Sequence, residues 1–170
     1  MKAEYINPFI KAVDNAFQTM LDCKVKRGDI ALKTSKKPGF EISGIIGLSG
    51  KAVGTVVLSL SEKVALKAAS VMLQFEATEI DDEVVDAVGE LANMVAGAAK
   101  AELEEYSLSV SLPNVITGRG HEIRFPSNVT PICVPFETPW GPLALEVGFD
   151  TTPGARQVHT AGAPAKVGSS

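Results

Sequence analysis

The 170-residue sequence has few of the side chains that metal centres and nucleophilic catalysis usually need. It contains two histidines, His121 and His159, and two cysteines, Cys23 and Cys133. The cysteines form no Cys-x-x-Cys pair and no disulfide framework, and two separated histidines argue against a zinc site or a Ser-His-Asp triad. The sequence therefore predicts no metal site, and we expect a protein with reduced thiols.

Basic clusters and long apolar runs are also missing. The formal net charge is −4, from 16 basic and 20 acidic residues, and this balance does not favour nucleic acid. The densest basic stretch, KTSKK at 33–37, precedes Pro38-Gly39 and is typical of a solvated loop. No apolar run approaches the roughly 20 residues that span a bilayer, and no secretory signal pattern is present. We expect a cytoplasmic protein that binds neither nucleic acid nor membrane.

The sequence matches none of the common catalytic motifs in full. GIIGLSGKA, which begins at Gly44, resembles a phosphate-binding loop, but it has one residue too many before Gly-Lys, and Ala52 replaces the magnesium-binding Ser or Thr. GRGHEI lacks the third glycine of a dinucleotide fingerprint, and no G-x-S-x-G or H-E-x-x-H pattern occurs. His121, beside Arg119 and Glu122, is better explained by loop structure than by acid–base catalysis. An enzyme with this sequence would carry little catalytic equipment of its own.

The first half of the chain is predicted to contain a helix, strands and a second helix. Asn7 suits an N-cap and Pro8 suits the first helical position, and an apolar stripe then continues to about Leu21. Strand-like segments span 24–32, 40–48 and 54–60. The turn SGKAVG joins the last two and predicts a hairpin. Ser61 is then expected to cap a short helix, EKVALKAASVML.

The second half resembles the first weakly, with a helix that is followed by strands and a hairpin. A long helix is predicted from about Asp81 to Glu105, with acidic residues at its positive N-terminal end. Extended segments follow it: YSLSVSL, PNVITG, PICVPFE and PLALEVGF, the last two joined by TPWG. Their prolines favour sheet edges or strand ends over central positions.

The repetition predicts an α+β fold over residues 1–150. In this fold two pseudo-symmetric halves share an antiparallel sheet, and long helices pack on it. Residues 151–170 are rich in Gly, Ala, Pro, Thr and Ser without an apolar period, and they are predicted to form a flexible tail.

The long helix contains the stretch DAVGELANMVAG, whose glycines and asparagine disfavour helix. At 100° per residue, one face collects the apolar residues and is expected to meet the core: Val84, Val88, Leu91, Val95, Ala98 and Ala99. The opposite face collects the polar and small residues Asp86, Glu90, Asn93, Gly97 and Glu104. Lys100 and Gly89 lie on one flank of it and Met94 lies on the other. A merely solvated face would more usually carry Lys, Glu, Gln and Arg, which favour helix.

Glu90 and Asn93 are three residues apart and are therefore neighbours on this polar face. Gly97, one turn beyond Asn93, leaves room beside them. The small residues Ala96 and Gly89 are expected on the rim of this face, where they would not project beyond the pair. We interpret the face as a surface that another protein approaches closely. An alternative stays open, because glycine would equally permit close packing of a strand or a second helix within the fold.

These segments carry a family resemblance. GELANMVAGAAKAEL, residues 89–103, resembles the signature helix of the CheC/CheX/FliY phosphatases of bacterial chemotaxis, whose core is E-x-x-N. EYINPFIKAVDNAFQTML resembles the first helix of the CheX branch in particular, and SLPNVITGRGHEI resembles the segment after the signature helix. The similarity covers about residues 3–149, and the fold of that family resembles the one expected here.

The resemblance implies an activity. Members of the family dephosphorylate the response regulator CheY, whose phosphoryl group is an acyl phosphate on an aspartate. Glu90 would pair with a lysine of the regulator, and Asn93 would hold a water for in-line attack on phosphorus. Asp86, Met94 and Gly97 would contact the regulator. The phosphorylated regulator would carry the magnesium, so that this chain needs no cofactor of its own.

The resemblance also implies one site per chain and a homodimer. CheC proteins carry two E-x-x-N sites and CheX carries one. Here Asn15 of the first helix has Ala12 where the acid would stand. Glu4 and Asn7 do spell E-x-x-N, but Asn7 is interpreted as a cap rather than as part of a helix face. Edge-strand pairing is a natural route to a dimer.

Two other functions stay open at this point. One is a non-catalytic module that binds a response regulator or a flagellar switch component through the same face. An intact Glu90/Asn93 pair speaks against it, because a pure binder does not need Asn93. The other is a CheX-like domain that serves a two-component pathway other than chemotaxis.

Overall fold

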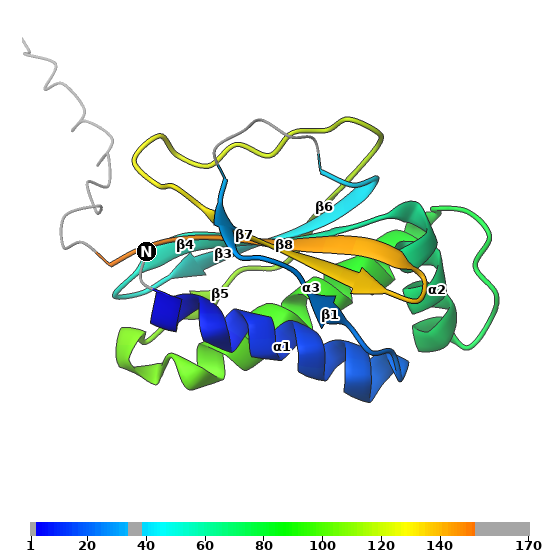
Figure 1. The fold of residues 1–170 in the computed structure, drawn as a ribbon, viewed down its shortest axis with the longest axis horizontal. Coiled ribbons are helices and arrows are strands. Elements are labelled where there is room, and N and C mark those ends of the chain that lie inside the picture. Colours follow the sequence, from blue (N-terminus) through cyan, green and yellow to red (C-terminus); the bar gives the residue numbers. More distant parts are fainter. Residues whose placement is uncertain (1–2, 34–38, 152–170) are drawn as a thin grey trace, which may run out of the picture.

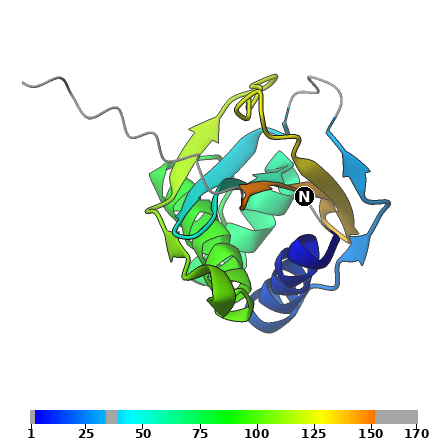
Figure 2. The same cartoon turned by 90° about the vertical axis from the view of Figure 1, so that its left-hand side faces the viewer.

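The computed structural model of the chain describes residues 3–33 and 39–151. Its centre is an antiparallel sheet of eight strands, and helices α1 (Ala3–Leu21) and α3 (Asp82–Glu102) pack side by side on one face of it (Figures 1 and 2). Helix α2 (Glu62–Leu73) lies at one end of the same layer and contacts both. The predicted α+β class is confirmed.

Two hairpins form the middle of the sheet, as the sequence predicts. Strand β3 (Ile42–Ser49) pairs with β4 (Val53–Leu60), and β7 (Ile132–Thr138) pairs with β8 (Gly141–Asp150). The two hairpins meet because β4 also pairs with β8 over the full length of β4.

Short strands complete the sheet in a crossed arrangement. Strands β5 (Ser109–Val110) and β6 (Asn114–Thr117), which follow α3, pair with β3 of the first half. Strands β1 (Lys26–Arg27) and β2 (Ala31–Leu32), which follow α1, pair with β7 of the second half. Each half thus supplies a helix, two short strands and a hairpin, and its short strands complete the hairpin of the other half. This exchange agrees with the two related halves that the sequence predicts.

The prediction of one strand over residues 24–32 is wrong, and Pro135 gives the reason. The Gly28 N–H donates to the Pro135 carbonyl at 2.8 Å, so this side of Pro135 faces the outer strand. Proline offers no N–H there, and a Cβ built on Gly28 would lie 2.9 Å from the Pro135 Cγ. The outer strand is therefore interrupted between β1 and β2. Pro135 lies inside β7 and pairs with Ala144 of β8, but no residue of β1 or β2 pairs with it on the other side.

The predicted start of α1 is also wrong. The helix begins at Ala3, so Asn7 is not a cap, and Pro8 lies inside the helix, where it removes one backbone donor. Packing holds these first turns. Ile6 is fully buried, and Tyr5 packs edge-on against Tyr106 with ring centroids 5.4 Å apart. Tertiary contacts override the local capping signal here.

The other two helices begin where the sequence predicts. The Asp81 carboxylate accepts a hydrogen bond from the Val84 N–H at 3.0 Å and caps α3. Ser61 precedes α2 but caps it by position only, since its hydroxyl has no hydrogen-bond partner in the described structure. Helix α3 ends at Glu102 and a 3₁₀ turn (Glu104–Tyr106) follows it, while the strand expected at YSLSVSL is reduced to β5.

The loop between β6 and β7, residues 118–131, crosses the face of the sheet opposite the helices (Figure 1). Lys33 holds it there: its Nζ donates to the Glu146 carboxylate at 2.7 Å and to the Ile123 carbonyl at 3.2 Å. Gly148 leaves room for the loop, because a Cβ on it would lie 2.6 Å from the Phe125 ring. The predicted Gly-rich loop is confirmed.

Some sequence predictions cannot be compared with the structure. Most of KTSKK and the predicted tail lie outside the described residues, as does His159. Within the described ranges, no helix combines the length and the hydropathy needed to cross a bilayer.

Candidate functional site

Helix α3 holds the candidate site on a firmly packed base. Its inner face is buried by the residues that the sequence predicts, Val84, Val88, Leu91, Val95 and Ala99. The helix lies close to β3, because Gly44 has no side chain: a Cβ there would be 2.7 Å from the Ala92 Cβ. The prediction that Ala98 faces the core is wrong. Ala98 is exposed, because the buried stripe narrows near the end of the helix.

The predicted catalytic pair lies on the outer face of α3. Glu90 is exposed and Asn93 is half-buried, and their spacing makes them neighbours on that face. Among the residues that the structure describes, neither side chain has a hydrogen-bond or ion-pair partner. A carboxylate, which accepts, and an amide, which both donates and accepts, are therefore available to a second molecule.

The two glycines of α3 have different roles. A Cβ built on Gly97 meets no atom within 4 Å, so the surface beside Asn93 is open there. A Cβ on Gly89 would lie 3.4 Å from both Pro113 and Val115 of the segment after α3, and Gly89 is buried. Close packing within the fold, the alternative that the sequence left open, is thus found at Gly89, whereas the approach of another protein at Gly97 stays a prediction. Ala96, expected on the rim, is also buried.

The predicted contact residues surround this pair. Asp86 is exposed one turn before Glu90, and Met94 is half-buried on the flank, so both lie next to the outer face as expected. Together with Gly97 they border an exposed helix surface rather than a closed cleft. Their role in binding stays a prediction.

The sequence analysis misses the residues on the Gly89 side of the site. Pro113 and Val115 pack against α3 there, and Leu112, the residue before Pro113, is 86% exposed. The available signal is SLPN itself, a proline after an apolar residue in an otherwise polar connection. That signal does not show where the segment packs, because the contact is tertiary.

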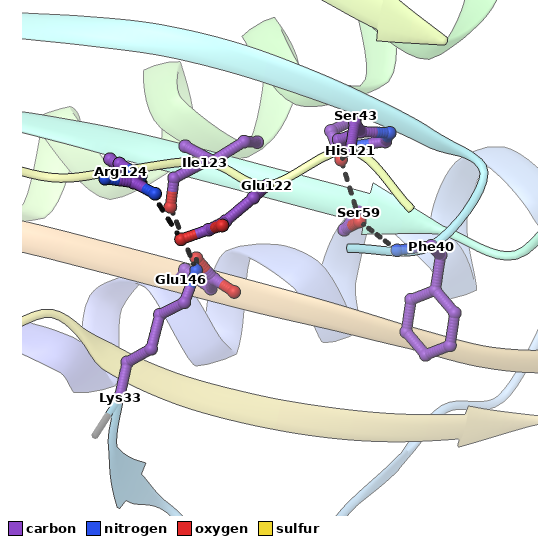
Figure 3. Close-up of polar contacts among 9 residues, drawn as sticks. All are labelled: Lys33, Phe40, Ser43, Ser59, His121, Glu122, Ile123, Arg124 and Glu146. Atoms are coloured by element: carbon purple, nitrogen blue, oxygen red, sulfur yellow. Dashed lines mark hydrogen bonds and ion pairs between the residues drawn. The ribbon is translucent and has the colours of Figure 1, made fainter. Parts of the chain in front are cut away.

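A second polar cluster lies under the 118–131 loop, on the opposite face of the sheet (Figure 3). The His121 Nε2 is 2.8 Å from the Ser43 hydroxyl, which is 2.8 Å from the Ser59 hydroxyl. The His121 Nδ1 donates to the Gly118 carbonyl at 2.7 Å, so Nε2 accepts from Ser43. Ser59 then donates to Ser43 and accepts from the Phe40 N–H at 2.9 Å.

This cluster fits a structural role. Ser43 and Ser59 are buried, and each group in the chain of hydrogen bonds has a partner within it. A nucleophile would need access to substrate. The cluster instead fastens the loop to the sheet, which agrees with the interpretation of His121 from the sequence.

No group of three or more potential metal ligands occurs among the described residues. Neither Cys23 nor Cys133 takes part in a disulfide there. Burial raises the pKa of the Cys23 thiol, which makes it a poor nucleophile near neutral pH. The outer face of α3 is therefore the strongest candidate site.

Comparison with known proteins supports the family resemblance. A family model described as chemotaxis phosphatase CheX matches residues 42–137, which include all of α3. The CheY-P phosphatase CheX of Thermotoga maritima is 29% identical over 127 residues, which are 73% of this chain and 82% of that protein.

Solved structures agree with the fold. A CheC-like superfamily protein from Shewanella sp. PV-4 is 33% identical, with a TM-score of 0.82, over 88% of this chain and 99% of that one. The chemotaxis protein CheX from Vibrio vulnificus is 32% identical, with a TM-score of 0.81, over 87% of this chain and 100% of that one.

Proposed function

The chain belongs to the CheX family of chemotaxis phosphatases, and we propose that it hydrolyses the aspartyl phosphate of a CheY-type response regulator with Glu90 and Asn93 as the working pair. The name of the Thermotoga relative, a CheY-P phosphatase, supports the substrate. The observation that carries the assignment of residues is the unpartnered pair on the outer face of α3, beside the open surface at Gly97.

Hydrolysis of an aspartyl phosphate needs few catalytic groups from the phosphatase. An acyl phosphate is already labile, and phosphoryl transfer depends mainly on the position of the nucleophile and on neutralisation of charge. The regulator would carry the magnesium that neutralises the phosphoryl oxygens. This chain would then contribute by placing one water in line with the bond that breaks.

Asn93 suits the task of holding this water. Its amide does not ionise, and it can accept a hydrogen bond from the water while it donates another. Because the side chain is half-buried on a packed helix, fewer rotamers are open to it than to a fully exposed asparagine. Water positioned in this way reacts faster than water that must be captured from solvent.

Glu90 suits the task of orienting the complex. As an exposed carboxylate one turn before Asn93, it can pair with a lysine at the active site of the regulator. Such a pair fixes the register between the two proteins and leaves Asn93 opposite the phosphoryl group. A regulator of this kind works in the cytoplasm, and so would its phosphatase.

The test is the decay of a phosphorylated CheY-type regulator, followed over a range of regulator concentrations. Asn93→Ala should lower kcat by on the order of 100-fold and leave KM nearly unchanged, because the water is lost but the docking face is not. Glu90→Lys should raise KM, because a lysine would face a lysine. If Asn93→Ala instead changed only KM, the water-positioning role would be wrong.

Two asparagines of α1 serve as matched controls. Asn15 and Asn7 are both exposed, and Asn7 follows Glu4 at the E-x-x-N spacing. Since α1 begins at Ala3, Asn7 is part of the helix rather than its cap, and the Glu4/Asn7 pair needs its own test. We expect Asn15→Ala and Asn7→Ala to leave the decay unchanged. A loss of activity with Asn7→Ala would indicate a second site.

The homodimer is likewise a proposal. The pair β1/β2 lies at one edge of the sheet, and edge strands carry backbone groups that a second chain can pair with. Sedimentation velocity at several protein concentrations would measure the state directly.

A further inference from the structure

Leu112 has the most exposed large apolar side chain among those that the structure reports as exposed. The residue is 86% exposed, and the next value, for Leu32, is 57%. Single exposed leucines are ordinary on protein surfaces. Two further properties distinguish Leu112: the backbone around it is fixed, and it lies beside the candidate site.

Three hydrogen bonds fix the backbone on the N-terminal side of Leu112. The Ser111 N–H donates to the Gly47 carbonyl at 2.9 Å, and the Gly47 N–H donates to the Ser111 hydroxyl at 2.8 Å. That hydroxyl in turn donates to the Leu112 carbonyl at 2.9 Å. Residue 111 is therefore tied to strand β3, and the leucine projects from a defined position rather than from a mobile loop.

Contacts on the C-terminal side place the segment that carries Leu112 on the Gly89 flank of α3. Pro113 packs against α3 at Gly89, and Gly89 lies one turn before Asn93 on the same side of the helix. Leu112 thus borders the outer face of α3 on one flank, as Met94 borders it on the other.

We propose that Leu112 is an apolar anchor that the response regulator buries when it docks on α3; this inference rests on the function proposed above. The occupant is the regulator rather than a second copy of this chain for a physical reason. A copy seated on Leu112 would cover the Gly89 flank of α3, one turn from Asn93, and it would obstruct the approach of the regulator to that amide. Burial of a leucine by the regulator strengthens docking without taking part in the chemistry.

The test compares Leu112→Ser with Leu32→Ser. Leu32 is the other strongly exposed leucine, and it lies on β2 at the far edge of the sheet. Binding of the regulator in its beryllofluoride-activated, magnesium-bound form should weaken about tenfold with Leu112→Ser and stay unchanged with Leu32→Ser. In the decay assay, Leu112→Ser should raise KM by a similar factor and leave kcat unchanged. Leu112→Met keeps an apolar side chain, so its affinity for the regulator and its KM should equal those of the wild type.

Each other outcome has a definite meaning. Unchanged binding in Leu112→Ser would overturn the anchor, and the proposed function would stand if Asn93→Ala still abolished decay. Loss of self-association in Leu112→Ser, with regulator binding unchanged, would assign the leucine to a dimer contact and overturn the anchor. If the wild-type protein bound the regulator through Leu112 without accelerating decay, the anchor would stand and the phosphatase would not. Because the side chain is exposed, all four proteins should unfold at about the same temperature.

Discussion

Gly97 gives a prediction in which stability and activity change in opposite directions. It lies in the interior of α3, where glycine costs about 1 kcal/mol relative to alanine. A Cβ at this position meets no atom within 4 Å, so alanine introduces no clash. Gly97→Ala should therefore stabilise the fold by about 0.8–1 kcal/mol and raise Tm by about 2–4 °C, measured by circular dichroism.

The open space beside Gly97 is also expected to affect docking of the regulator. If the regulator comes close to α3 beside Asn93, a longer side chain at position 97 will stand between the two proteins. Gly97→Gln should therefore lower kcat/KM for the phosphorylated regulator at least about tenfold, equivalent to about 1.4 kcal/mol of lost transition-state stabilisation. Its Tm should not fall below that of the wild type, since glutamine also favours helix over glycine.

Ala98→Gln is the matched control. Ala98 is exposed next to Gly97 but points about 100° away around the helix, so the same substitution there should leave kcat/KM unchanged. Full activity in Gly97→Gln would show that the glycine is not kept open for a partner. A lower Tm in Gly97→Ala would show that the surroundings of Gly97 are not open.

Three further predictions concern the fold. Gly44→Ala would place a Cβ 2.7 Å from the Ala92 Cβ, and because both atoms are fixed to backbone, calorimetry should show a loss of about 1–3 kcal/mol. Lys33→Met leaves the nearly buried Glu146 without its cation and should lower the free energy of unfolding in urea by about 3 kcal/mol. The double variant Lys33→Met with Glu146→Leu should recover most of this loss. A double variant no more stable than the single one would refute this. Burial raises the pKa of the Cys23 thiol above its unfolded value, so the contribution of this thiol to stability is complete below about pH 8.5 and is lost as the pH rises further. In the folded protein Cys23 should react slowly with a thiol reagent at pH 8. Rapid reaction would contradict its burial.

The sequence predicts those elements whose signals are local and strong. The Asp81 cap with its acidic first turn marks the start of α3, and glycine turns between apolar runs mark both hairpins. The buried face of α3 follows from its period alone, with Ala98 as the exception. The E-x-x-N pair was placed correctly on the outer face for the same reason.

The errors occur where tertiary contacts decide. Asn7-Pro8 is a good local cap, but burial of Ile6 extends α1 beyond it. Residues 24–32 have the composition of one strand, but Pro135, more than a hundred residues away in the chain, divides it. No local pattern contains that information.

The site shows the same limit. Gly89 and Gly97 are equivalent in any calculation of helix propensity, yet one packs under Pro113 and the other opens to solvent. The exposure of Leu112 also depends on where its segment crosses α3. The sequence therefore predicted the helix face but not the surface that borders it.

The most direct test of the account is single-turnover decay of a phosphorylated CheY-type regulator with this protein in saturating excess. Saturation removes docking from the measured rate, so only the hydrolysis step is compared. The account predicts fast decay with the wild type and, with Asn93→Ala, decay close to that of the regulator alone. Equally fast decay with Asn93→Ala would contradict the role of Asn93, and no acceleration by the wild type would contradict the proposed function itself.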